Sequence, residues 1–287
     1  MSVPEEPARL ELSHVTVAYD YKSRPALSDV TLQVPHGARV AVVGPNGAGK
    51  STLFKALIGL LPIRIGSVFI HGQPLGAHRD CVAYVPQREE VDWRFPVTVA
   101  DVVVMGRYGR LGWLKRPGRH DWEVVTRSME QLAVADLARR PIGELSGGQQ
   151  RRAFLARALA QEPHILLMDE PFSGIDAATQ ETTLELLNQL RAEKVTVLLS
   201  THDLNLAATC FDQVMLLNGR LIGHGPSAQV LTSQTITETF GGQVFWLDAR
   251  GGDPLREMIT SPLRRQGTTA SHCCPPPPGE APRTMRP

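Results

Sequence analysis

The sequence predicts an α/β fold built around a parallel β-sheet, and two observations carry this prediction. Residues 40–43 and 165–168 are unbroken apolar runs, and residues 195–199 are apolar apart from Thr196, which is typical of strands that a parallel sheet buries on both faces. The first run leads into a glycine-rich loop, after which leucines recur at helical spacing over residues 53–61. With 42% hydrophobic residues among 287, the chain has enough apolar side chains for a sizeable core.

Two further patterns predict antiparallel strands. Apolar residues recur at every second position over residues 15–19 and 30–34, as in strands with one buried face, so we expect a small N-terminal antiparallel β subdomain. Near the end of the folded part, residues 214–217 and 221–222 flank an Asn-Gly pair, which is typical of a hairpin turn.

The segment between the first two apolar runs predicts a helical subdomain at about residues 90–160. Thr98 and Asp101 match the capping pattern of a helix that runs to Met105. An apolar stripe indicates a second helix, and it consists of Trp122, Val125, Met129 and Leu132. We expect the folded domain as a whole to cover residues 10–245.

Residues 248–287 differ in composition from the rest of the chain. They include eight prolines and have almost no apolar periodicity, which predicts a flexible C-terminal tail. The tail contains His272, Cys273 and Cys274, which could bind a soft metal ion, although three adjacent ligands alone make a weak site. An incidental tail sequence is the favoured interpretation.

Composition excludes several classes of function. Thirty basic and 29 acidic residues leave a net charge of +1, so the chain has no excess positive charge to bind nucleic acid. The apolar runs are far shorter than the roughly 20 residues of a membrane-spanning helix. The N-terminus lacks the basic and then apolar start of a signal peptide, and four cysteines are too few for a disulfide framework. We therefore expect a cytoplasmic protein with no nucleic-acid partner.

A phosphate-binding loop is the strongest motif in the sequence. The segment Gly44-Pro45-Asn46-Gly47-Ala48-Gly49-Lys50-Ser51 fits G-x-x-x-x-G-K-[ST], and it follows a strand and precedes a helix as this motif requires. Its backbone N–H groups would bind phosphates, and Lys50 would place a charge beside the β and γ phosphates. We expect the loop and the adjoining Thr52 to bind a nucleoside triphosphate, and Ser51 to coordinate Mg²⁺. The sequence thus predicts a P-loop NTPase core.

Two acids directly follow the second apolar run. Asp169 and Glu170 come after residues 165–168, at the carboxyl end of a strand, where ligands collect in parallel α/β sheets. Adjacent strand residues point in opposite directions, so Asp169 is expected to hold Mg²⁺ and Glu170 to polarise the attacking water. Two acids that cap the next helix are the alternative interpretation, which the phosphate loop makes the weaker one.

A further glycine-rich motif, LSGGQ, occupies positions Leu145, Ser146, Gly147, Gly148 and Gln149. Its serine and glycines open a helix whose N-terminus can bind a phosphate, although an ordinary Ser-Gly helix cap would look similar. Together with the phosphate loop and the acidic strand end, this signature peptide makes the chain resemble the ATP-binding-cassette (ABC) family. The resemblance covers about residues 10–245 and implies an enzyme that hydrolyses ATP with Mg²⁺.

The resemblance also assigns roles to single residues. Tyr19, with Tyr21 as its rival, matches the aromatic residue that stacks on adenine. Gln87 matches the glutamine that reaches Mg²⁺ and the water, and His202 matches the histidine that contacts the γ phosphate. The loop that crosses the dimer interface corresponds to Ser173, Gly174, Ile175 and Asp176. Catalytic roles are therefore expected for Glu170, His202 and Gln87, and Mg²⁺ coordination for Ser51, Gln87 and Asp169.

The same resemblance implies two kinds of protein partner. In this family the signature peptide completes the nucleotide site of a partner chain, so two copies would form a head-to-tail dimer. The dimer would lie on the cytoplasmic face of the inner membrane as a peripheral protein, bound to an integral-membrane permease. The permease would dock near residues 87–109, which supply apolar groups for a groove: Trp93, Phe95, Val97, Val99 and Val102.

Two segments, residues 88–117 and 171–179, resemble the ABC proteins that energise the uptake of manganese, zinc or iron ions. An extracytoplasmic metal-binding protein and the permease would then select the ion. Two alternatives remain open: an importer of iron chelates or haem, and a soluble ABC ATPase that remodels a protein or nucleic-acid assembly. A single cassette with near-zero net charge favours the transporter, and a P-loop kinase would have no use for LSGGQ.

Overall fold

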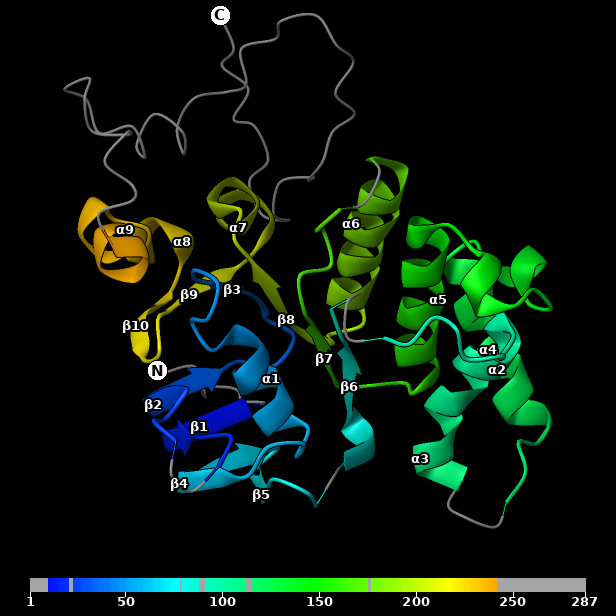
Figure 1. Cartoon of the computed structure of the whole chain (residues 1–287), viewed down its shortest axis with the longest axis horizontal. Helices are drawn as coiled ribbons and strands as arrows, with labels where there is room; N and C mark the ends of the chain where they lie inside the picture. Colours follow the sequence, from blue (N-terminus) through cyan, green and yellow to red (C-terminus); the bar gives the residue numbers. More distant parts are fainter. Residues whose placement is uncertain are drawn as a thin grey trace, which may run out of the picture.

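The computed structural model describes residues 10–20, 23–77, 79–87, 91–111, 115–174 and 177–241. Figure 1 shows an antiparallel sheet at one end, a central sheet and, at the other end, a group of helices. The strands are β1 (Leu10–Val17), β2 (Leu27–Val34), β3 (Arg39–Val43), β4 (Ile63–Ile70), β5 (Gln73–Pro74), β6 (Val82–Val85), β7 (Ile165–Met168), β8 (Thr196–Thr201), β9 (Gln213–Leu217) and β10 (Leu221–Gly225). The predicted α/β fold is confirmed.

The helices lie both around the core sheet and in the segment between β6 and β7. The α-helices are α1 (Lys50–Leu57), α2 (Val99–Val104), α3 (Tyr108–Leu111), α4 (Arg119–Gln131), α5 (Gly147–Ala160), α6 (Ala177–Ala192), α7 (Leu204–Cys210), α8 (Ser227–Val230) and α9 (Ser233–Phe240). Short 3₁₀ turns lie at η1 (Arg79–Cys81), η3 (Met105–Arg107), η4 (Ala135–Leu137) and η5 (Ile142–Glu144). The helices α2 to α5 thus stand between β6 and β7 in the chain.

The antiparallel sheet has the strand order β2-β1-β4-β5. β2 buries Leu27, Val30, Leu32 and Val34 and exposes the residues between them, so one face of the sheet packs on a core while the other meets solvent. In β1 the pairing shifts between Leu12 and Val15. This bulge keeps the apolar residues on both sides of it buried.

The core sheet has the strand order β10-β9-β3-β8-β7-β6, and its strands from β9 to β6 run parallel. Every residue of β3, β7 and β8 is buried, because both faces of the sheet are covered. In β7, Leu166 and Met168 pack with the helices α2, α4, α5 and α6, whereas Ile165 and Leu167 pack with α1 and the antiparallel sheet. The sheet therefore separates two apolar cores.

The helical subdomain packs around α5, which contacts both α2 and α4. α2 begins with the predicted capping box, in which Thr98 and Asp101 each accept a hydrogen bond from the other's backbone N–H. Arg107 of η3 is 3% exposed and donates to the Asp121 carboxylate of α4 and to the carbonyl of Ala160 at the end of α5. One buried side chain thus joins three elements.

Some predicted core positions were wrong. Trp122 is 43% exposed, and Val124 instead lies buried beside Val125 on the inner face of α4. The leucine pattern after the phosphate loop also runs past the helix, because α1 ends at Leu57 and Leu60 is exposed in the turn that follows.

The five predicted docking groups for a permease differ in how far they are exposed. Val99 and Val102 are fully buried in the core of the helical subdomain, so they are not available to a partner. Trp93 and Val97 are partly buried against the same core, and Trp93 packs edge-on against Phe154. Phe95 alone of the five is largely exposed, at 61%.

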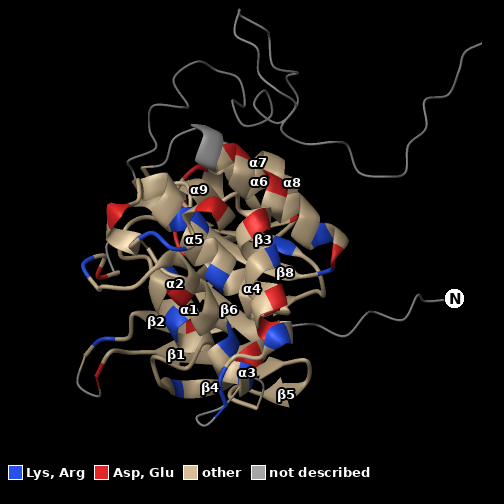
Figure 2. Ribbon diagram, turned by 90° about the vertical axis from the view of Figure 1, so that its right-hand side faces the viewer, with Lys and Arg blue, Asp and Glu red and all other residues tan. Residues whose placement is uncertain are grey.

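Several predictions concern residues outside the described ranges, among them the tail at 248–287 and its cluster of His272, Cys273 and Cys274. Within the described ranges, every helix is too short or too polar to cross a bilayer. Figure 2 shows acidic and basic residues interspersed along the ribbon, in keeping with the near-zero net charge.

Candidate active site

The predicted site residues follow four neighbouring strands of the core sheet. The phosphate loop follows β3, His202 follows β8, Asp169 and Glu170 follow β7, and Gln87 follows β6 after one residue. Because these four strands are parallel and adjacent, their carboxyl ends share one edge of the sheet. The fold thereby brings to one edge motifs that lie far apart in the sequence.

The phosphate loop wraps around the side chain of Lys50. Lys50 Nζ donates to the carbonyl oxygens of Gly44 at 2.8 Å and Pro45 at 3.1 Å, and the side chain is only 5% exposed. Gly49 has φ of 96°, and a Cβ there would strike Leu27, so only glycine fits this close turn. The loop therefore holds an ammonium group at the first turn of α1.

Two opposing effects act on Lys50. Burial lowers the pKa of its ammonium group, while the charges of Glu170 and Asp169 raise it, and the net pKa lies below the ordinary value for lysine. Lys50 Nζ lies 3.7 Å from Glu170 Oε1. An anion bound beside Lys50 would favour its charged form in the same way as these carboxylates.

Ser200, at the end of β8, holds the two acids in position. Its hydroxyl donates to Asp169 Oδ1 at 2.5 Å and accepts from the backbone N–H of Glu170 at 2.8 Å. The hydroxyl of Tyr84 in β6 lies 3.4 Å from Asp169 Oδ2. Asp169 is therefore buried with partners from the strands on either side of β7.

Glu170 leaves the strand in an unusual backbone conformation. Its φ is 44°, in the left-handed region that non-glycine residues rarely adopt. This turn carries the carboxylate toward Lys50 and toward Ser173, whose hydroxyl donates to Glu170 Oε2 at 3.0 Å. The strained turn separates the directions of the two acids, so that they can serve different ligand atoms.

Arg151 connects the signature helix with the acidic turn. Its guanidinium donates to the carbonyl of Glu170 at 2.7 Å and to that of Ser173 at 3.1 Å. Arg151 lies in α5, one turn after its N-cap residue Ser146, which forms a capping box with Gln149. The predicted helix N-terminus at LSGGQ is thus confirmed as local structure, and Arg151 links its helix to the turn after β7.

The other predicted residues have the following positions. Tyr19 is 59% exposed, and its hydroxyl hydrogen-bonds to Thr52 Oγ1 of α1 at 3.0 Å, so its ring lies beside the phosphate loop. His202 is exposed and Gln87 is partly buried. Tyr21, Ile175 and Asp176 lie outside the described residues.

Sequence reasoning missed the positioning roles of Ser200 and Arg151. Ser200 precedes Thr201 in the strand that leads to His202. Arg151 lies two residues beyond LSGGQ. A signal existed for Ser200, since a polar residue in an otherwise apolar buried strand needs a hydrogen-bond partner.

The phosphate loop and the acidic end of β7, on one edge of a largely parallel sheet, define a P-loop nucleoside triphosphatase. A family model described as ABC transporter matches residues 27–173. The chain belongs to the ABC transporter family, as one of its ATP-binding ATPase proteins. In such a transporter complex the ATPase binds ATP and works with a membrane permease.

Three comparisons describe the similarity. The manganese transport system ATP-binding protein MntB of Bacillus subtilis is 48% identical over 238 residues, covering 83% of this chain and 94% of MntB. The zinc transport system ATP-binding protein TroB of Treponema pallidum is 46% identical over 235 residues, covering 82% and 88%. A solved structure of a metal-chelate type ABC transporter in an inward-facing conformation has a TM-score of 0.71 and 28% identity, covering 81% and 88%.

Proposed function

We propose that this chain hydrolyses ATP to drive the import of a divalent transition metal ion, manganese, zinc or iron, through a separate membrane permease. The observation that carries this proposal is its identity of 46–48% with ATP-binding proteins of manganese and zinc transport systems, over 88–94% of their lengths. The phosphate loop, Asp169 and Glu170 would supply the groups that ATP binding and hydrolysis need.

The donor atoms at the sheet edge suit Mg²⁺. Ser51 offers a hydroxyl, Gln87 an amide oxygen and Asp169 a carboxylate, and a hard cation prefers such oxygen ligands. These three residues would hold the ion, which would neutralise charge on the phosphates. Asp169 is already oriented by Ser200 and Tyr84.

Hydrolysis requires a base that orients the attacking water. Glu170 fits this role, because its carboxylate lies at the sheet edge, where it accepts a hydrogen bond from the Ser173 hydroxyl and pairs with Lys50 Nζ at 3.7 Å. His202 ends the adjacent strand and would contact the γ phosphate. Tyr19 would stack on the adenine, since its exposed ring lies beside Thr52.

The complete catalytic site would be shared between two copies of the chain. The phosphate loop opens α1 and the signature peptide opens α5, and these helices pack on opposite faces of the core sheet. A head-to-tail dimer would bring residues 145–149 of one copy to the γ phosphate held by the other. Residues 173–176 would cross that interface. ATP would close the dimer and hydrolysis would release it, because ADP lacks the group that both copies bind.

The dimer would lie on the cytoplasmic face of the inner membrane and transmit its closure to the permease. Exposed Phe95 supports docking at residues 87–109. An extracytoplasmic metal-binding protein would deliver the ion, and the balanced charge supports the absence of a nucleic-acid partner.

The test is the metal content of cells whose only copy of the gene encodes Glu170→Gln. Under metal limitation we expect selective loss of manganese, zinc or iron relative to wild type, because the variant binds ATP but cannot activate the water. The purified variant should retain ATP binding, lose turnover and accumulate as a dimer in ATP.

A matched control is Glu185→Gln, which makes the same change at an exposed position of α6. This control should keep both turnover and metal content. Unchanged levels of all three metals in the Glu170→Gln strain would contradict the import function, and near wild-type turnover would contradict the role of Glu170 as base.

Import of an iron chelate or haem is the second candidate, supported by the structural similarity to a transporter of the metal-chelate type. The same Glu170→Gln strain distinguishes the two. Loss of growth on chelated iron or haem, with normal uptake of the free ions, would favour the second candidate.

A further inference from the structure

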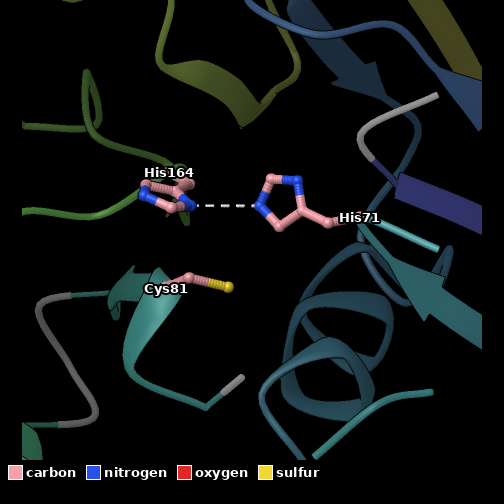
Figure 3. Close-up of side chains that lie close together, drawn as sticks. All are labelled: His71, Cys81 and His164. Atoms are coloured by element: carbon pink, nitrogen blue, oxygen red, sulfur yellow. Dashed lines mark hydrogen bonds between the residues drawn. The ribbon is translucent and has the colours of Figure 1, made fainter. Parts of the chain in front are cut away.

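Three metal-ligating side chains converge at the edge of the core sheet opposite the active site. His71 follows β4, Cys81 ends η1 and precedes β6, and His164 precedes β7. Figure 3 shows the two imidazole rings beside each other and joined by a hydrogen bond, with their planes nearly perpendicular and the Cys81 side chain directed beneath the space between them. The nucleotide residues follow the carboxyl ends of the strands, whereas this cluster lies at their amino ends.

The fold places these residues together for a definite reason. Strands β6 and β7 are parallel neighbours whose pairing starts at Val82 and Ile165, so the residues before them, Cys81 and His164, are adjacent. The backbone N–H of His164 donates to the carbonyl of Cys81 at 2.8 Å. His71 reaches the same point from the antiparallel sheet, across the boundary between the two sheets.

The distances suit a shared cation. His164 Nδ1 lies 3.1 Å from His71 Nε2, and one ligand atom from each of the three residues lies within 4.8 Å of the others. In a tetrahedral zinc site two nitrogens are about 3.3 Å apart, and a nitrogen and a sulfur about 3.6 Å apart, from the usual bond lengths. The two nitrogens are thus close to the separation that zinc requires, and the thiol must approach them by up to about 1.2 Å.

The donor set selects a class of cation. Two imidazoles and a thiolate suit zinc and the other borderline or soft transition metals, whereas Mg²⁺ and Mn²⁺ prefer oxygen ligands. Cys81 is buried at 7% exposure, and His164 is exposed. An ion would therefore enter from the His164 side and keep a fourth position for water or another ligand.

We propose that His71, Cys81 and His164 form a binding site for a zinc-class divalent cation, distinct from the nucleotide site. Binding converts the Cys81 thiol to a thiolate and releases one proton to solvent. The proton shared between the two imidazoles moves to the outer nitrogen of its ring, so that both inner nitrogens coordinate the ion. The bound ion joins the antiparallel sheet to the core sheet.

The experiment is a Co²⁺ titration of the full-length, nucleotide-free protein, because thiolate-bound Co²⁺ has a characteristic charge-transfer absorption. The tail contains its own candidate ligands, so the starting protein carries H272A, C273S and C274S. We expect one Co²⁺ per chain with thiolate absorption, displaced by Zn²⁺ but not by an equal concentration of Mn²⁺.

Three variants of that protein test the ligands. Cys81→Ser should abolish the thiolate absorption, and His71→Ala and His164→Ala should weaken Co²⁺ binding by more than the ~10–100-fold that loss of an outer-shell partner costs. His164 is exposed, so His164→Ala tests the site even where Cys81→Ser disturbs folding. The controls are Cys210→Ser, the other buried cysteine of the described residues, and His14→Ala, an exposed histidine of β1.

A second measurement is thermal unfolding with and without Zn²⁺. Zn²⁺ should raise the Tm of the starting protein and of both controls, because it binds the folded state. It should leave the Tm of the three ligand variants unchanged. Absence of thiolate absorption in the starting protein would overturn the proposal. So would Co²⁺ binding that survives in His164→Ala with unchanged affinity. Both outcomes are independent of which ion the transporter carries.

Discussion

The Ser200 hydroxyl contacts both of the acids that follow β7. A single hydroxyl holds the Asp169 carboxylate and the Glu170 backbone N–H, so it sets the relative orientation of the proposed Mg²⁺ ligand and the proposed base, which are adjacent in the chain. Ser200 and Asp169 are both fully buried, so loss of the hydroxyl would leave the carboxylate oxygen without this donor. In the proposed mechanism Ser200 is a positioning residue, because it would act on the reaction through Asp169 and Glu170.

Ser200→Ala should lower kcat for ATP hydrolysis by about 10- to 100-fold, the range that small misplacement of catalytic groups costs. It should also destabilise the fold by about 1–3 kcal/mol through the unsatisfied buried groups. Steady-state kinetics and urea unfolding measure the two effects, and KM for ATP should change little, because the phosphate loop is intact.

Ser128→Ala is the matched control for this substitution. Ser128 is equally buried, and its hydroxyl donates to the Val124 carbonyl within α4, away from the sheet edge. The control should lose stability and keep kcat. Equal kcat in both variants would show that Ser200 has only a structural role.

At the scale of elements, the helical subdomain depends on one buried charge. Arg107 donates to Asp121 at 3.0 Å and to Glu162 at 2.8 Å, and its own side chain is 4% exposed. The N–H of Gly118 and the Arg107 guanidinium lower the pKa of Asp121. Burial opposes the ionisation of Glu162, but the hydrogen bond and charge of Arg107, with the charge of Arg110, bring its pKa below the ordinary value as well.

Arg107→Met should destabilise the protein by about 3–5 kcal/mol at pH 7, because it leaves the Asp121 carboxylate buried without its cation. A lowered carboxyl pKa stabilises the fold above the unfolded pKa of about 4, and this contribution is lost as the pH falls through the folded value. The difference between wild type and variant should therefore shrink between pH 5 and pH 3, as urea unfolding at several pH values would measure.

The control for this network is Arg119→Met, which breaks the exposed pair of Arg119 with Glu123 on α4. Exposed pairs at this spacing contribute about 0.3–0.5 kcal/mol. A pH-independent effect of Arg107→Met would mean that lost packing, rather than lost charge, causes the destabilisation.

Elements with a strong local pattern could be predicted from the sequence. The apolar run at residues 165–168 predicts β7 with the bounds that the structure shows, and the spacing of Thr98 and Asp101 predicts the capping box of α2. Positions such as Trp122 could not be predicted, because an apolar residue at the edge of a helical stripe is buried only if a neighbouring element covers it. The motifs can be predicted for the same reason as the strands, because each motif is a contiguous stretch of sequence.

At the scale of the whole molecule, the order of the strands in the sheet determines which residues far apart in the sequence become neighbours. The core order β3-β8-β7-β6 places Ser200 beside Asp169, and the pairing of β6 with β7 places Cys81 beside His164. No contiguous pattern encodes these neighbours, because residues from 31 to 83 positions apart meet only after the sheet has formed. The sequence therefore does not predict the cluster of His71, Cys81 and His164. It does show the adjacent candidate ligands at 272–274, which make a weak site.

The proposed head-to-tail dimer can be tested by mixing two variants that are each inactive. Ser146→Arg blocks the signature peptide, and Lys50→Ala disables the phosphate loop. In a head-to-tail dimer, a mixed pair has one site with both parts intact and one with both damaged. An equal mixture should therefore recover up to about one quarter of the wild-type number of sites, whereas each variant alone has none.

ATPase assays on the separate and mixed proteins measure this recovery. A mixture as inactive as its components would contradict a site shared between chains, since only a shared site can be rebuilt from two different defects. Wild type mixed with either variant serves as the reference for exchange of subunits.

Strand β7 connects the cluster at the amino end of the sheet to the nucleotide residues at its carboxyl end, and an extended strand has little freedom to change its length. His164 precedes its four residues and Asp169 follows them, a Cα separation of about 16 Å in extended chain. Hydrogen bonds to β6 and β8 on both sides prevent the strand from buckling. A displacement of His164 along the strand axis is therefore a displacement of Asp169 by the same amount, so the two ends of β7 move as the two ends of one rod.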